Sequence, residues 1–445
     1  MNQRSDAVCP DSSAELTSVG SWLHTSVPLK SAWAVCDNAT FAATNFLVAV
    51  VVARHVSLEE YGTYALAQSI VLFLSIFHTA FITEPMLVFG SARYRESVGE
   101  YVSATVGIHI GMFLVIDAVL VIAILVLGTA GLSMWARALS MAAVGSPLIL
   151  LGWFLRKACY IKKAPETACM AGVIYVAGVV PCIWILSTTG AMNGLRAFGV
   201  MGAAAIPASL WILVRIGARC RWPQERTFFA DLLRQHLRYG RWALGAGAMR
   251  WVPFNVPLIA LASSGSACSS GALRALMTML MPAIQFFQAV NTMLIPFCAG
   301  RSRSRVARLV ATAGVAESLA AVAYTVVMWL TSRTVLHALY AGKYDAYAWY
   351  LAPLSLLLVG EALGGVVSSA LQALQLPRKV FAACLAGALL TALGTIAFRP
   401  FELNQAVWLI VGVYGSTAGL LVFSLYRVLA EPGIASLKAR EESCV

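Results

Sequence analysis

The stretch RIGARCRWPQERTFFADLLRQHLRYGR, residues 215–241, is the longest polar interruption of an otherwise apolar chain. On both sides of it, apolar runs recur that are long enough to cross a hydrocarbon layer about 30 Å thick. Hydrophobic residues make up 60% of the 445 residues and charged residues 12%, whereas soluble proteins carry about 25% charged residues. The sequence therefore predicts an all-α polytopic membrane protein that this stretch divides in two.

Hydropathy predicts about twelve transmembrane helices, six before the interruption and six after it. The first six are expected near 32–53, 64–87, 104–128, 134–154, 168–187 and 194–214. The second six are expected near 241–262, 272–298, 308–330, 346–371, 380–398 and 405–426. Within the interruption, apolar residues recur at helical spacing opposite Arg234 and Arg238, which is typical of an amphipathic helix lying in the membrane interface. A solvated linker that phospholipid charge holds at the membrane surface and a regulatory element both fit that pattern.

The predicted domain organisation has five parts. They are a disordered cytoplasmic tail at 1–31, a six-helix bundle at 32–214, the amphipathic linker at 215–240, a second six-helix bundle at 241–428 and a cytoplasmic tail at 429–445. About three quarters of the 32 Lys and Arg residues fall in the tails and the loops on their side, so the positive-inside rule places both termini in the cytoplasm. This placement explains the net charge of +12 without nucleic acid as a partner.

The two halves of the chain begin alike. KSAWAVCDNATFAATNFLVAVVVARHVSLEEYGTYALAQSI, from residue 30, and RYGRWALGAGAMRWVPFNVPLIALASSGSACSSGALRALMTML, from residue 238, align on a shared tryptophan. The alignment brings Asn45 near Asn255 and Gly62 onto Gly271. Six spans is an even number, so the halves are expected to be parallel repeats around a central cavity. Transporters built from repeats bind near the bilayer midplane and expose their site alternately to the two sides.

The seventh predicted span, GAMRWVPFNVPLIALA at 247–262, carries a permanent charge and two prolines. A charge at the centre of a bilayer costs at least ~2.5–3.5 kcal/mol, so Arg250 is expected to face a cavity or a partner. A guanidinium offers a planar fork of donors that suits phosphate oxygens. We therefore expect Arg250 to meet an anionic ligand group such as phosphate, with a structural salt bridge to a membrane carboxylate such as Asp37 as the alternative.

Polar side chains form stripes on several predicted spans, and amides and hydroxyls suit sugar hydroxyl groups. The same side chains also form hydrogen bonds that hold membrane helices together. For each polar residue taken singly, this structural role is the alternative to lining a cavity. Stripes at matching places in both halves favour a shared polar cavity. Besides Arg250, the residues predicted to line it are Asp37, Asn38, Asn45, His78, Asn255, Gln285, Gln288 and Asn291.

Three carboxylates, Asp117, Glu317 and Glu361, fall near the centres of predicted spans. Buried carboxylates can carry protons or bind Na⁺, so these residues are candidates for coupling transport to an H⁺ or Na⁺ gradient. A structural pair bonded to a neighbouring helix is the alternative for Asp117 and Glu317. Neither a phosphate-binding loop, a paired-cysteine spacing nor a catalytic arrangement occurs in the sequence, so we expect no enzyme activity, no cofactor and no metal site.

The segment NFLVAVVVARHVSLEEYGTYALAQSIVLFLSIFHTAFITEPMLV, from residue 45, resembles the opening of bacterial polysaccharide transporters of the O-antigen flippase type. These proteins commonly have a stretch of the form ar.ls.eeyG.yala.si between their first two spans, and residues 53–70 match it. LRYGRWALGAGAMRW, from residue 237, is similar to the start of their seventh span. Length, span number and the division into two sets of six extend the resemblance over nearly the whole chain.

The resemblance implies membership of the multidrug/oligosaccharidyl-lipid/polysaccharide exporter superfamily. It implies two six-helix bundles that move undecaprenyl-diphosphate-linked oligosaccharides across the bacterial inner membrane for O-antigen, capsule or exopolysaccharide export. Polysaccharide polymerases, glycosyltransferases and membrane lipids are the implied partners. Cavity cations would bind the diphosphate, with Arg250 as the candidate and Lys30 and Arg241 at the inner mouth. The chain lacks the two extra C-terminal spans of the lipid II flippase branch, and its first span carries Asp37 where that branch has arginines.

Two other functions remain open from the sequence. A cation-coupled small-molecule or multidrug antiporter of the same superfamily would use Asp37, Asp117 or Glu317 as coupling carboxylates. A membrane scaffold for polysaccharide enzymes would transport nothing and would not need its cavity.

Overall fold

The computed structural model describes residues 33, 36–91, 93–94, 96–162, 164–218, 226–264, 267–298, 302–374, 376–398 and 401–430. The described residues form helices joined by short connections, with no strand among them. The predicted tail at 1–31, with Lys30, lies outside these residues. So do 219–225 of the predicted linker and 431–445 of the predicted second tail.

The N-terminal half begins with the helix Cys36–His55. It continues with α2 (Leu58–His78), the π-helix η1 (Thr79–Thr83), α3 (Glu84–Ser91), α4 (Val98–Thr129), α5 (Ser133–Ile161), α6 (Pro165–Thr188) and α7 (Gly194–Ile216). Local sequence fixes several ends of these helices. The Ser57 hydroxyl accepts a hydrogen bond from the Glu60 N–H at 3.1 Å and caps α2, and Gly217, with φ of 70°, ends α7.

The C-terminal half begins with α8 (Arg226–Ser263), α9 (Ala267–Cys298) and α10 (Arg303–Tyr340). The 3₁₀-helix η2 (Asp345–Tyr350), α11 (Leu351–Ser355), α12 (Leu357–Ala373), α13 (Pro377–Ala397) and α14 (Leu403–Ala430) follow. The predicted tenth span, 346–371, is thus a broken helix made of η2, α11 and α12. α8 contains both the predicted interfacial helix and the predicted seventh span without a break.

The structure confirms the predicted fold class. Among the described residues, 11 helices are long and apolar enough to cross a membrane. The seventh predicted span, 241–262, is also helical, as the C-terminal part of α8, but it is not one of these 11. Its segment carries the charges of Arg241 and Arg250, which interrupt the apolar stretch. The chain is therefore a multi-pass membrane protein.

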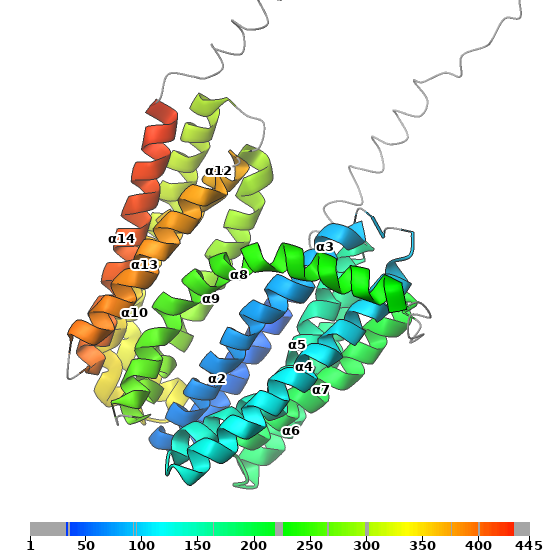
Figure 1. The fold of residues 1–445 in the computed structure, drawn as a ribbon. Helices are drawn as coiled ribbons and strands as arrows, with labels where there is room; N and C mark the ends of the chain where they lie inside the picture. The colour runs from blue at the N-terminus through cyan, green and yellow to red at the C-terminus, as the bar shows by residue number, and fades with distance from the viewer. Residues whose placement is uncertain are drawn as a thin grey trace, which may run out of the picture.

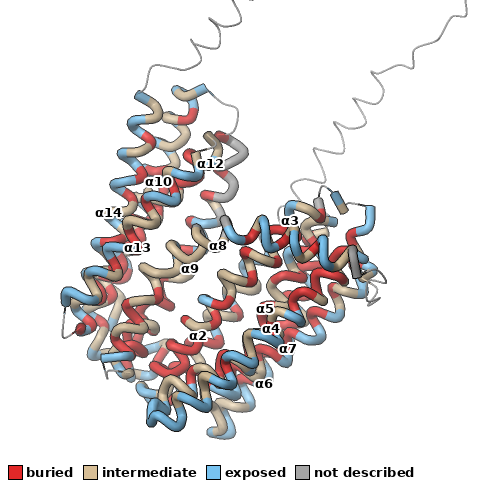
Figure 2. Tube along the Cα trace, in the orientation of Figure 1, coloured by how far each residue is buried: buried red, intermediate tan, exposed pale blue. Residues whose placement is uncertain are grey.

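Two helical bundles lie side by side (Figure 1). They are close together at the end where α2 and α9 begin, and they diverge toward the opposite end, where α8 crosses from one to the other (Figure 1). Buried residues lie mainly inside each bundle, whereas much of α4 is exposed (Figure 2). Exposed side chains of α4 include Leu114, Val115 and Leu125, and such an apolar surface suits contact with lipid.

Candidate functional site

The end where the bundles meet is closed by direct backbone contact between α2 and α9. A Cβ atom on Gly271 would lie 2.9 Å from the carbonyl oxygen of Leu58 and 3.0 Å from the amide nitrogen of Gly62. A Cβ on Gly62 would overlap the carbonyl of Ala267. The two glycines that correspond in the aligned halves therefore pack against each other's helices, and we refer to this contact as the glycine crossing.

Lys343 adds a second tie at the same end. It lies between α10 and η2, and its Nζ donates to the carbonyl oxygens of Arg54 at 2.5 Å and Val56 at 2.8 Å. These carbonyls belong to the end of the first helix and the turn after it, where helical backbone acceptors lack a partner. The C-terminal half thus caps a helix of the N-terminal half.

A half-buried cation lies beside the glycine crossing. Nε and Nη1 of Arg274, on α9, are buried without a hydrogen-bond partner among the described residues, as are the hydroxyls of Tyr61 and Tyr344. Arg274 interacts electrostatically with Tyr61 and Tyr340. A guanidinium stays charged at physiological pH, and a buried charge without a counter-charge disfavours the state that encloses it. The closed end therefore holds a half-buried guanidinium, two of whose nitrogens have no hydrogen-bond partner among the described residues.

Arg250 lies on α8, which packs on both bundles. Its side chain is exposed, and it forms no salt bridge within the described part of the chain. It interacts electrostatically, beyond salt-bridge distance, with Glu84 at the start of α3 and with Glu361 on α12. Asp37, which was the example of a membrane carboxylate that could form a salt bridge with Arg250, binds Arg156 instead. Arg250 is thus an accessible cation with one carboxylate neighbour from each bundle.

Asn255, about one turn beyond Arg250, is buried. Its Nδ2 donates to the carbonyl oxygen of Trp251 at 3.1 Å, and its Oδ1 has no partner among the described residues. The Trp251 indole N–H donates to the Ser69 carbonyl of α2 at 3.2 Å. This tie holds the turn that carries Arg250 against the N-terminal bundle.

Two amide–carboxylate pairs join helices of the C-terminal bundle. Gln288 Nε2 donates to Glu361 Oε1 at 3.5 Å, between α9 and α12. Asn291 Nδ2 donates to Glu317 Oε2 at 3.3 Å, between α9 and α10. Asn291 and Glu317 are both buried, and Asn291 Oδ1 and Glu317 Oε1 have no partner among the described residues. The Glu317 carboxylate can accept a proton, and both buried oxygens can ligate a cation.

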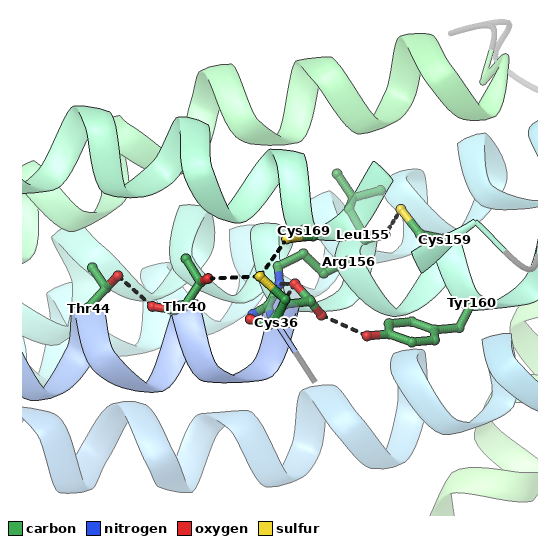
Figure 3. A network of polar contacts seen from close by, with 9 residues as sticks. Cys36, Thr40, Thr44, Leu155, Arg156, Cys159, Tyr160 and Cys169 are labelled. Atoms are coloured by element: carbon green, nitrogen blue, oxygen red, sulfur yellow. Dashed lines mark hydrogen bonds and ion pairs between the residues drawn. The ribbon is translucent and has the colours of Figure 1, made fainter. Parts of the chain in front are cut away.

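Asp37 binds Arg156 and Tyr160 inside the N-terminal bundle; these two residues belong to the polar network of Figure 3. Its Oδ1 accepts hydrogen bonds from Arg156 Nε at 2.8 Å and forms a 2.7 Å ion pair with Arg156 Nη2, while Oδ2 accepts from the Tyr160 hydroxyl at 2.8 Å. The guanidinium also stacks 4.2 Å from the ring centre of Phe41. Asp37 is 1% exposed, so in this conformation it is not accessible to a ligand.

We expect Arg156→Leu to destabilise the protein strongly. Removing one partner leaves the Asp37 carboxylate buried without a counter-charge, which costs about 3–5 kcal/mol. The double variant Asp37→Leu/Arg156→Leu should recover most of that loss, since two apolar side chains can replace a buried pair. The Tm of the detergent-solubilised protein measures both effects. A single variant as stable as the unmodified protein would show that the pair contributes no net stability.

His78 also lies inside the N-terminal bundle rather than on an accessible surface. Its Nε2 is 3.0 Å from Nδ1 of His109, and both side chains are buried. His78 immediately precedes η1.

His236, on α8, connects that helix to η1. Its Nδ1 donates a hydrogen bond to the Phe81 carbonyl of η1 at 2.9 Å. The hydroxyl of Tyr101 lies 3.0 Å from the other ring nitrogen of His236. Burial lowers the pKa of His236, so this imidazole joins α8 to the N-terminal bundle as a neutral group.

The remaining predicted site residues are spread over several helices. Asp117, on the largely exposed α4, has a buried Oδ1 without a partner among the described residues, and it lies in the other bundle from Glu317. Asn38 and Gln285 are exposed, Asn45 is half-buried, and Arg241 is exposed near the bend of α8. The structure brings together Arg250 with Glu361 and Gln288, and Asn291 with Glu317, but not Asp37 or His78 with any of these.

Arg156 and Arg274 were missed as site residues by sequence reasoning. Arg274 lies inside a predicted span, which is the signal that singled out Arg250, and the same argument would have found it. Arg156 lies at the inner end of a predicted span, where positive charge is ordinary. Its pairing with Asp37 joins residues far apart in the sequence, and no local pattern marks it.

No protein-family profile matches this sequence, and neither does any curated protein. Solved structures do match. An inward-facing multidrug resistance MATE family transporter of the MOP superfamily is 14% identical, with a TM-score of 0.66, over 86% of this chain and 92% of its own. The lipid II flippase MurJ, in an inward closed conformation, is 13% identical, with a TM-score of 0.66, over 89% of this chain and 87% of its own.

A MOP superfamily transporter from Pyrococcus furiosus is 13% identical, with a TM-score of 0.62, over 90% of this chain and 94% of its own. At such identities the similarity establishes the fold, which is that of the MOP superfamily transporters. These neighbours are transporters and flippases rather than enzymes.

Proposed function

We propose that this chain is a flippase for undecaprenyl-diphosphate-linked oligosaccharides. It would move repeat units across the bacterial inner membrane by alternating access, for O-antigen, capsule or exopolysaccharide export. Both termini would be cytoplasmic, which makes the end where the bundles diverge the inner end. The observation that carries the proposal is Arg250, an accessible arginine on α8 with a carboxylate neighbour in each bundle and no salt bridge among the described residues.

The chemistry of the site supports a phosphate ligand. Arg250 can grip phosphate oxygens with two parallel hydrogen bonds, and Arg274 offers a second guanidinium toward the closed end. This function requires two kinds of partner. Glycosyltransferases would supply the substrate, and a polymerase would consume it. The resemblance at residues 45–88 and the fold shared with a lipid II flippase point the same way.

The proposal is tested by reconstitution. Purified protein in proteoliposomes should move a fluorescently labelled, undecaprenyl-diphosphate-linked oligosaccharide between leaflets, as reported by the fraction accessible to an added glycosidase. The same lipid carrying a single phosphate should move more slowly, because it offers fewer oxygens to the arginines. If the protein moves neither lipid faster than empty liposomes do, the proposed function is wrong.

We further propose that the Asn291–Glu317 pair couples transport to an H⁺ or Na⁺ gradient, with Glu361 as a second carboxylate in the same bundle. Glu317→Gln should remove the acceleration that an imposed gradient gives to flipping, while leaving slow gradient-independent flipping in place. The exposed Glu100→Gln, at the start of α4, is the matched control and should keep the acceleration. If Glu317→Gln responds to the gradient as the unmodified protein does, the coupling assignment fails.

A cation-coupled multidrug antiporter is the second candidate. The observation that favours it is the same buried carboxylate pair, together with a fold shared with a MATE family multidrug transporter. Gradient-driven efflux of cationic dyes by proteoliposomes that do not flip lipid-linked sugar would select this function over the first.

A further inference from the structure

A pocket with a cavity volume of about 360 Å³ opens at the end of the C-terminal bundle that carries the Lys343 tie. Its described lining residues lie at the end of α8, in the first turn of α9, on η2 and at the beginning of α14. Its size falls in the range of about 300–1,000 Å³ that small-molecule sites occupy. The residues that line it include Ser264, Ser269, Tyr347, Tyr350, Phe401 and Glu402.

The described lining residues provide three aromatic rings, four hydroxyls, two of them on the tyrosines, and one carboxylate. Aromatic faces pack on the apolar faces of sugar rings, while hydroxyl and carboxylate oxygens accept hydrogen bonds from sugar hydroxyls. The lining therefore suits a neutral or amino sugar.

An aromatic belt at the membrane surface is the simpler explanation for tyrosines at the end of a helix. Trp349 fits it, because that side chain is 60% exposed. Tyr347 and Tyr350 do not, since both are half-buried and line the pocket. The Trp349 ring stacks on the Tyr350 ring with 3.7 Å between their centres, which holds Tyr350 in place. The Tyr350 hydroxyl also interacts electrostatically with Glu402.

We propose that this pocket is a saccharide-binding site on the outer face of the protein. The inference rests on the proposed function, which makes this end the outer end and brings a glycan to it. The phosphates and the sugars of one substrate would then be held by different parts of the chain. The arginines of the centre bind the diphosphate, and the pocket binds a sugar unit that has reached the outer side.

The test is a fluorescence titration of the full chain in lipid nanodiscs. The probe is the phosphate-free repeat unit released by mild acid from the surface polysaccharide of the native strain. A saturable change in tryptophan fluorescence is expected, and Trp349→Phe should abolish that signal. Tyr350→Ala and Glu402→Gln should each weaken binding at least ten-fold. Tyr426→Ala is the matched control, because Tyr426 is exposed at the far end of α14, and it should leave binding unchanged.

Three results would overturn the inference. They are no saturable signal, equal affinity in Tyr350→Ala and Glu402→Gln, and displacement of the sugar by inorganic phosphate. A signal that follows the phospholipid composition of the nanodisc instead of the added sugar would assign the pocket to a lipid headgroup and also exclude a saccharide site. If Tyr350→Ala fails to fold, the affinity of Glu402→Gln alone decides whether the pocket binds the sugar. Sugar binding without lipid flipping would contradict the proposed function and support the saccharide site. Lipid flipping without sugar binding would support the proposed function and contradict the saccharide site.

Discussion

Arg250→Ala is expected to lower flipping of a diphosphate-linked oligosaccharide in proteoliposomes by roughly ten- to hundred-fold at substrate concentrations below saturation. Hydrogen bonds to a charged group contribute about 1.5–3 kcal/mol each, and 1.4 kcal/mol corresponds to a factor of ten. Arg250→Lys should recover part of the loss, because it keeps the charge and loses the planar fork of donors. Display of surface polysaccharide in cells, compared at equal protein levels, checks the same effect.

Arg234→Ala is the control for this experiment. Arg234 lies on the same helix, and its exposed 3.6 Å ion pair with Asp231 is of a kind that contributes little. It should flip substrate at the unmodified rate. If Arg250→Ala and Arg250→Lys both match the unmodified protein, Arg250 does not bind the phosphates.

Gly62→Val is expected to prevent the two bundles from closing at the glycine crossing. Any Cβ at this position overlaps the carbonyl of Ala267, which is backbone and cannot move aside as a flexible side chain could. The variant should therefore leave the structure described here and open the end around Arg274. Thr278, on α9, is 5% exposed, so a Thr278→Cys reporter should react with an impermeant maleimide only when Gly62→Val is also present.

Gly111→Val is the matched control, because nothing lies within 4 Å of a Cβ at Gly111 on α4. It should keep Thr278→Cys protected and transport active. Gly271→Val should behave like Gly62→Val, since Gly271 meets α2 from the other side. If Gly62→Val leaves the reporter protected, the crossing does not close this end of the molecule.

Periodicity and hydropathy predicted the helical fold because those signals are local. The positions of the helices, the cap at Ser57 and the division at 215–241 can all be read along the chain. The correspondence of Gly62 with Gly271 was also visible. Its meaning was not, because only the packing of α2 on α9 shows that each glycine makes room for the backbone of the other's helix.

The partners of polar side chains could not be predicted in the same way. A stripe of polar residues on the first span does not reveal whether it faces a cavity or a neighbouring helix. The carboxylate of Asp37 turned out to be satisfied by Arg156 and Tyr160, and His78 by His109. Hydrogen bonds within a membrane helix bundle and groups that bind a ligand use the same residue types, so composition alone cannot separate them.

The continuity of α8 has a mechanical consequence. Its first part is held to one bundle through His236, and its last part packs among the helices of the other. If the bundles move relative to each other, as the proposed function requires, α8 would carry part of that movement beside the glycine crossing and the Lys343 tie. Pro253 and Pro257 lie within α8 just beyond Arg250, where each removes a backbone hydrogen-bond donor. α8 would then both carry this movement and hold Arg250. Movement of the bundles would therefore act directly on the side chain that is proposed to bind the phosphates.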